Sequence, residues 1–150
     1  MRVGKQSLRN QGSIMKSVAV FGAFDLVHPG HKAFLAQAKA LGDHLTVYLA
    51  RDQVIQELKG KAPSWSYQQR KRALLALPEV DRVLKGDHAL GTYRGICISQ
   101  PDIIALGYDQ EALESNVSAW MNDYGMHIPI VKLEPFKEDI YKTSKLRVIE

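Results

Sequence analysis

The chain has 150 residues, which predicts one domain with a core of its own, and a formal net charge of +4, which suits anionic small molecules as easily as nucleic acid. The single cysteine, Cys97, excludes an internal disulfide and a cysteine-rich metal site, and we expect a buried thiol with no catalytic role. Because no apolar run approaches the ~18 residues of a membrane span and no leader is evident, we expect a cytoplasmic protein with no membrane partner.

Residues 1–16 are polar and basic and show neither the helical nor the strand period, so we expect a flexible N-terminal extension before a domain of residues 17–150. In that domain, short apolar stretches alternate with stretches of helical period. The expected strands cover residues 18–21, 45–50, 80–84, 102–106 and 128–133. The expected helices cover residues 31–41, 53–58, 66–77, 93–99 and 111–124.

Two local signals refine this assignment. Ser66 and Gln69 have the spacing of a capping box, which predicts a helix start at Ser66. Pro129 predicts that the last strand lies at a sheet edge or begins there. The alternation as a whole predicts an α/β fold, a Rossmann-like, doubly wound sheet of five parallel strands that binds ligands at the carboxyl ends of the strands.

The segment that follows the first strand carries a glycine turn and then two histidines. Gly22 allows the backbone to come close to a ligand, and a helix that begins near Pro29 would project His28 and His31 from its first turn. Free N–H groups and the helix dipole favour an anion at that place. The segment therefore predicts a phosphate site. Zinc could use the same spacing, but the sequence shows no convincing third ligand, so the metal ligands stay open.

The run G-x-F-D-x-x-H-x-G-H over residues 22–31 resembles the signature of the nucleotidyltransferase superfamily, which includes cytidylyltransferases, pantetheine-phosphate adenylyltransferase and archaeal-type FAD synthases. The resemblance implies the nucleotidyltransferase fold, Mg²⁺, and transfer from ATP or CTP to a phosphorylated acceptor without an enzyme nucleophile. It also implies that His28 and His31 stabilise the transition state. Backbone contacts to phosphate would come from Gly22, Ala23 and Phe24.

A second resemblance lies at residues 141–147, where Thr143, Ser144 and Arg147 match the superfamily's second signature and would contact the triphosphate. An ordinary N-cap before a basic helix is the alternative.

The resemblance also places a basic loop and the helix after it on the phosphates of acceptor and triphosphate. Lys59 and Lys61 would bind the acceptor, and Arg70 is counted with the catalytic residues because its planar fork can hold phosphate bidentately. Asp25 and Asp52 are expected near the acceptor, where they would serve structure, magnesium or a substrate hydroxyl.

The loop after the fourth strand favours one acceptor. Its Leu-Gly-Tyr-Asp-Gln run at residues 106–110 looks most like the archaeal-type FAD synthases, which implies AMP transfer from ATP to FMN, giving FAD and pyrophosphate. Gly107, Tyr108 and Asp109 would then bind the nucleoside. An aromatic residue could stack on the flavin, although buried aromatics are more often core. The candidates are Trp65, Tyr67, Tyr108 and Tyr141.

Two alternatives stay open. One is a cytidylyltransferase that acts on glycerol-3-phosphate or another small phosphate. The other is a non-catalytic nucleotide- or nucleic-acid-binding module, which would bind oligonucleotides in a salt-sensitive way. We favour the enzyme, and with it a homodimer that has no nucleic-acid partner.

Overall fold

The computed structural model describes residues 15–89 and 91–135. Within them, five strands form one sheet in the order β3-β2-β1-β4-β5, and every neighbouring pair is parallel. The strands are β1 (Ser17–Gly22), β2 (His44–Leu49), β3 (Arg82–Lys85), β4 (Ile103–Leu106) and β5 (Ile130–Lys132). The helices are α2 (Pro29–Lys39), α3 (Asp52–Lys59), α4 (Tyr67–Leu75), α5 (Arg94–Ser99) and α6 (Glu111–Asp123). The predicted α/β fold with five parallel strands is confirmed.

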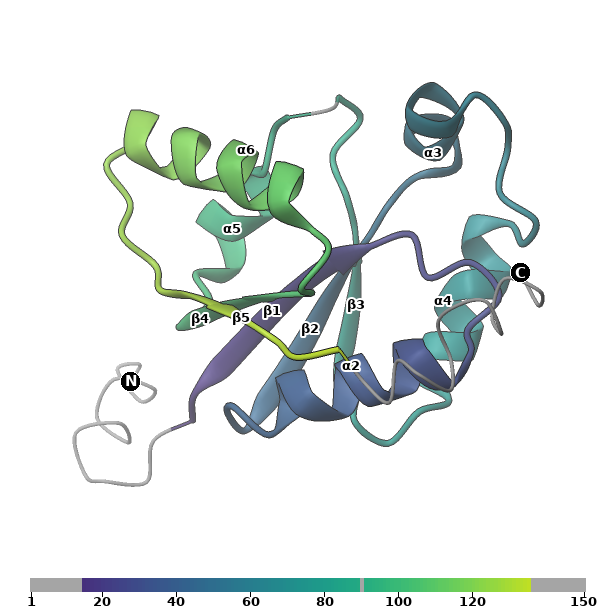
Figure 1. Ribbon diagram of the computed structural model, residues 1–150, viewed down its shortest axis with the longest axis horizontal. Helices are drawn as coiled ribbons and strands as arrows, with labels where there is room; N and C mark the ends of the chain where they lie inside the picture. Colours follow the sequence, from purple (N-terminus) through teal and green to yellow (C-terminus); the bar gives the residue numbers. More distant parts are fainter. Residues whose placement is uncertain (1–14, 90, 136–150) are drawn as a thin grey trace.

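Helices cover both faces of the sheet, with α2 and α4 on one side and α5 and α6 on the other (Figure 1). The alternation of side chains along each strand fills the two layers separately. Val18 and Val20 of β1 pack with Leu35 of α2 and Leu74 of α4. On the opposite face, the core joins residues of β4, α5 and α6, namely Ile96, Ile104, Leu106, Val117, Trp120 and Met121. This burial on both faces explains why the strands read as apolar runs.

The strand order creates a switch point between β1 and β4. The chain proceeds from β1 outward to β2 and β3, then crosses back to place β4 on the other side of β1. Connections that leave β1 and β4 therefore diverge at their carboxyl ends, which is where open α/β sheets bind ligands. The loops 23–28 and 107–110 both start at this point.

Three local predictions are tested by these elements. The capping box of Ser66 and Gln69 is present at the start of α4. The edge position of β5 is confirmed, and Pro129 directly precedes this strand with its carbonyl accepting from the Ile104 N–H at 2.9 Å. The prediction of a buried Cys97 is wrong, because Ile96 takes the inward position of α5 and Cys97 is exposed.

Among the described helices, none has the length and apolar character needed to cross a bilayer.

Replacement of Gly95 should destabilise the fold. A Cβ at Gly95 would lie 2.5 Å from Cε1 of Tyr48, whose ring is held by stacking on Phe21. We expect Gly95→Ala to lower the free energy of unfolding by about 1–3 kcal/mol through overpacking, measured by urea denaturation. Cys97→Ala on the exposed face of the same helix is the control and should change it by less than about 0.5 kcal/mol. Equal stabilities of the two variants would contradict this packing.

Candidate active site

The loop between β1 and α2 has a constrained backbone. Phe24 and Leu26 both adopt positive φ values, 46° and 54°, which side chains with a Cβ disfavour. The Phe24 ring is buried against Gly22, where an added Cβ would lie 2.7 Å from Cε2 of that ring. Gly22 is therefore required by packing inside the loop, a reason that the sequence pattern did not reveal. The buried ring fixes the path of the chain into α2.

His28 and His31 cap the helix that they begin. Nδ1 of His28 accepts from the Gly30 N–H at 3.1 Å, and Nδ1 of His31 accepts from the His28 N–H at 3.3 Å. The two rings stack with their centroids 3.8 Å apart. An imidazole that accepts at Nδ1 carries its proton at Nε2 when neutral. The helix start therefore presents two Nε2–H donors side by side.

The environment of His31 keeps its imidazole neutral. Burial, with the neighbouring His28 and Lys59 charges, lowers the pKa of His31 from 6.5 to about 4, against the opposing effect of Asp25. The Phe24 ring packs edge-on against the imidazole, with ring centroids 5.3 Å apart. At neutral pH His31 is therefore a hydrogen-bond donor and not a cation.

Lys59 lies close enough to act electrostatically on His31. It is the last residue of α3 and is exposed, as is Lys61 in the loop that follows. Gly60 ends the helix in the left-handed conformation, with φ of 77°. The basic loop predicted from the sequence thus stands at the histidine end of the sheet, and its contact with a substrate stays a prediction.

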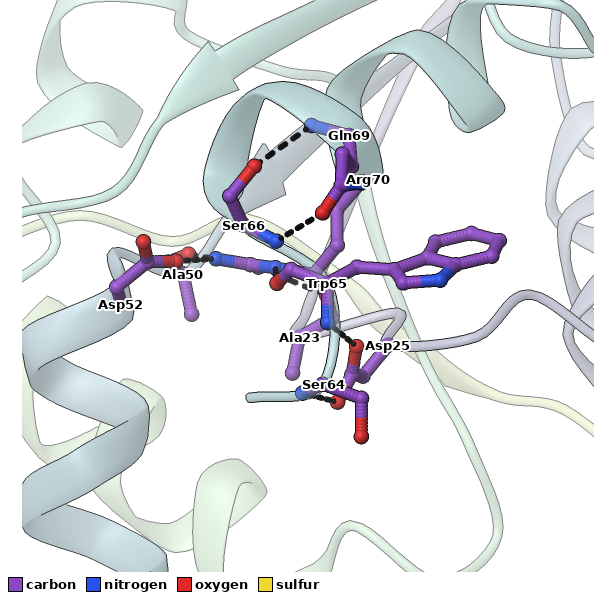
Figure 2. A network of polar contacts seen from close by, with 9 residues as sticks. All are labelled: Ala23, Asp25, Ala50, Asp52, Ser64, Trp65, Ser66, Gln69 and Arg70. Atoms are coloured by element: carbon purple, nitrogen blue, oxygen red, sulfur yellow. Dashed lines mark hydrogen bonds and ion pairs between the residues drawn. The ribbon is translucent and has the colours of Figure 1, made fainter. Parts of the chain in front are cut away.

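Arg70 differs from expectation. Its side chain is fully buried, and the guanidinium donates to three carbonyl oxygens: Trp65 at 3.1 Å, Ala23 at 2.9 Å and Ala50 at 2.9 Å (Figure 2). It also pairs with Asp52, with Nη2 and Oδ1 2.5 Å apart. The fork that was expected to hold phosphate instead ties together the chain beyond β1, the chain beyond β2 and the loop before α4. Arg70 therefore connects these loops beneath the site, and its contact with a phosphate stays a prediction.

The two carboxylates expected near the acceptor also hold the scaffold. Asp25 accepts from the N–H groups of Ser64 and Trp65, at 2.7 Å and 2.9 Å (Figure 2). Asp52 is engaged by Arg70, although nearly half of its side chain is exposed. The structure therefore connects the loop after β1 to the loop before α4 by two polar links, Asp25 and Arg70.

Sequence reasoning considered Gln110 only as the end of the run over residues 106–110, yet its side chain braces the switch point. Its Oε1 accepts from the Gly107 N–H at 2.8 Å, and its Nε2 donates to the Phe21 carbonyl at 3.3 Å. This amide joins the ends of β4 and β1, while the Tyr108 and Asp109 side chains are exposed beside it. A glutamine directly after a strand-end Gly-x-x turn is the only signal that could have identified the brace.

Two further predictions concern the triphosphate contacts and the ligands of Mg²⁺. Thr143, Ser144 and Arg147 lie outside the described residues. In the described part of the chain, no group of three or more His, Cys, Asp or Glu side chains could hold a metal ion. Since Asp25 and Asp52 already accept hydrogen bonds, these residues do not fit a Mg²⁺ site made by protein alone.

A pair of capping imidazoles at a helix start, placed at the switch point of a parallel sheet, is an arrangement that suits a phosphate ligand. Comparison with known proteins agrees. A family described as "Cytidylyltransferase-like" matches residues 19–147. The chain belongs to this family. It is a nucleotidyltransferase, and the match includes the histidine segment and the β4 loop.

Curated relatives of similar length are FAD synthases. The enzyme from Ferroglobus placidus is 38% identical over 136 residues, which cover 91% of this chain and 87% of the relative. The enzyme from Thermococcus sibiricus is 37% identical over 130 residues, covering 86% and 88%.

Solved structures share the fold. The lipopolysaccharide core biosynthesis protein from Thermoplasma volcanium matches with a TM-score of 0.75 and 33% identity, over 82% of this chain and 99% of that one. Pantothenate synthetase from Thermus thermophilus matches with a TM-score of 0.60 at 16% identity, over 96% of this chain and 65% of that one. The second likeness concerns the fold alone.

The buried position of Arg70 predicts a loss of stability when it is replaced. Arg70→Met leaves three carbonyl groups without their donor and should lower the free energy of unfolding by about 2–4 kcal/mol, measured by urea denaturation. Arg72→Met, on the exposed side of the same helix, is the control and should have little effect. An Arg70→Met protein of unchanged stability that lost only substrate binding would show that Arg70 contacts phosphate.

The neutral state of His31 can be tested by NMR. Its imidazole should titrate near pH 4 when its ring resonances are followed through an acid titration. Between pH 6.5 and about 4 the unfolded chain binds a proton that folded His31 does not, so acid in this window should lower the free energy of unfolding. In His31→Gln that contribution should vanish. Titration of His31 near 6.5 would contradict the burial of its ring.

Proposed function

We propose that this nucleotidyltransferase transfers AMP from ATP to FMN. A phosphate oxygen of FMN attacks the α-phosphorus of ATP, a new P–O bond forms, and the bond to the β-phosphate breaks so that pyrophosphate leaves. The observation that carries the proposal is the pair of capped imidazoles at the switch point. The FAD synthase relatives, which match most of the chain, support the choice of acceptor.

The imidazole pair suits this reaction because charge grows on the non-bridging oxygens of the α-phosphate. Donors that are already fixed in direction stabilise such charge without reorganisation. Each Nδ1 is occupied by a backbone N–H, so each Nε2–H can point to a phosphate oxygen. No side chain needs to act as nucleophile, and the exposed Cys97 stays without a role.

The order of the strands also suggests where the nucleoside and the phosphates of the substrates bind. ATP enters as its magnesium complex, with the metal held by the triphosphate. The nucleoside lies over the β4 loop at Gly107, Tyr108 and Asp109, and Lys59 and Lys61 approach the phosphates. Contact of the triphosphate with Thr143, Ser144 and Arg147, a homodimeric state and a cytoplasmic location stay predictions.

Substrate choice is tested by pyrophosphate release. We expect release from ATP with FMN, and none from CTP with glycerol-3-phosphate. Release from the CTP pair alone would establish the cytidylyltransferase alternative. Salt-sensitive oligonucleotide binding without release from either pair would establish the non-catalytic module.

The imidazoles are tested by substitution. His28→Ala or His31→Ala should lower kcat by roughly 10²-fold, about 2.7 kcal/mol, because one transition-state donor is lost while ATP binding remains. ATP affinity is measured by calorimetry, and His127→Ala, in an exposed position before the amino end of β5, is the control. Unchanged pyrophosphate release in both α2 variants would disprove this mechanism.

A further inference from the structure

A polar hollow of about 280 Å³ lies at the carboxyl ends of β2 and β3. Its lining residues come from the start of α3, the start of α4 and the end of β3, and they are Arg51, Asp52, Gln53, Tyr67 and Lys85. Leu49 pairs with Lys85 across the two strands, so the ends of β2 and β3 form one wall of the hollow. The hollow is separate from the β1–β4 switch point but opens at the same edge of the sheet.

The hollow carries two cations, Arg51 and Lys85, and the charge of Arg51 is partly offset by Asp87, whose pKa it helps to lower. In the described part of the chain, no carboxylate lies within ion-pair distance of Arg51 or Lys85, and Asp52 is paired with Arg70. Both cations are held in place. Nε of Arg51 donates to the Gly86 carbonyl at 2.8 Å, and Nζ of Lys85 lies 4.6 Å from the centre of the Tyr67 ring. Fixed cationic donors that form no ion pair with a described carboxylate of their own favour a ligand that accepts hydrogen bonds.

The spacing between strands indicates which part of the acceptor molecule can occupy the hollow. Neighbouring strands lie about 4.8 Å apart, so a hollow between β2 and β3 lies roughly 7 Å from the end of β1, where the imidazoles begin. The acceptor phosphate must reach the imidazoles to react and cannot occupy the hollow at the same time. The nucleoside takes the β4 side. The body of the acceptor therefore extends over β2 and β3.

We propose that this hollow binds the dioxopyrimidine edge of the flavin ring of FMN, with Arg51 and Lys85 donating to its carbonyl oxygens and Gln53 pairing with its N–H. This inference rests on the proposed function. This edge of the ring has several hydrogen-bond acceptors and one N–H donor. The lining supplies cationic donors and the Gln53 amide, which can both donate and accept a hydrogen bond. The ribityl chain spans the distance to the imidazoles.

The test compares riboflavin, which has the ring without the phosphate, with FMN. By calorimetry, Lys85→Met should weaken riboflavin and FMN alike, about tenfold in Kd for one lost charged hydrogen bond. Arg51→Gln should act in the same direction. Because Arg51 also holds the Gly86 carbonyl, the Lys85 variant decides the matter if Arg51→Gln does not fold. Arg82→Gln, exposed at the opposite end of β3, is the charge-matched control and should change neither affinity.

Each outcome of this comparison is decisive. In turnover, Lys85→Met should raise KM for FMN while kcat stays unchanged, since the lost contact is distant from the reacting phosphorus. Weaker binding of FMN with unchanged riboflavin would show that the hollow takes a phosphate and would overturn the inference. Unchanged binding of both would overturn it while pyrophosphate release from ATP and FMN leaves the proposed function standing. A wild-type protein that neither binds riboflavin nor uses FMN would overturn both.

Discussion

The site depends on one buried guanidinium. Three loops must meet at the carboxyl edge of the sheet, and each leaves carbonyl groups that helix or strand cannot pair. Arg70 gathers such groups from Ala23, Ala50 and Trp65, and its charge is balanced by Asp52. A planar fork with several fixed donors suits this task, whereas a lysine could not hold the same set in one geometry. By holding the Ala23 carbonyl, Arg70 fixes the position of the chain where it leaves β1 and continues to the histidines.

The histidines show how one side chain can serve fold and chemistry at once. Their Nδ1 atoms accept from the backbone at the start of α2, which is the work that serine or aspartate does at most helix starts. An aspartate there would place a negative charge against a polyphosphate. An imidazole caps the same N–H groups, stays neutral, and leaves a donor at Nε2. Burial against Phe24 preserves this state, since it lowers the pKa of His31 to about 4.

Sequence reasoning predicted the fold but not the contacts that hold the site's loops together, and the difference has a physical cause. Periodicity identifies strands such as Val18–Phe21 and a capping box such as Ser66–Gln69, because both are local patterns. Contacts between distant loops have no such pattern. Arg70 was expected on phosphate because its family motif identifies the residue but not the direction of its side chain. Gln110 and the Gly22–Phe24 contact were missed for the same reason. Cys97 was misplaced because a helix of six residues gives too short a pattern to assign a face.

The strand order separates chemistry from specificity. The imidazoles lie at the end of the central strand β1, where β2 and β4 hold the backbone on both sides and the Gln110 brace links β1 to β4. Apart from Asp52 and the carbonyl groups that Arg70 holds, the outer connections carry side chains that can change without moving the imidazoles. Family members with different acceptors can therefore keep one reaction and vary the flanks. In this chain the flank at β2 and β3 carries Arg51 and Lys85, so the acceptor should be decided there and not at the histidines.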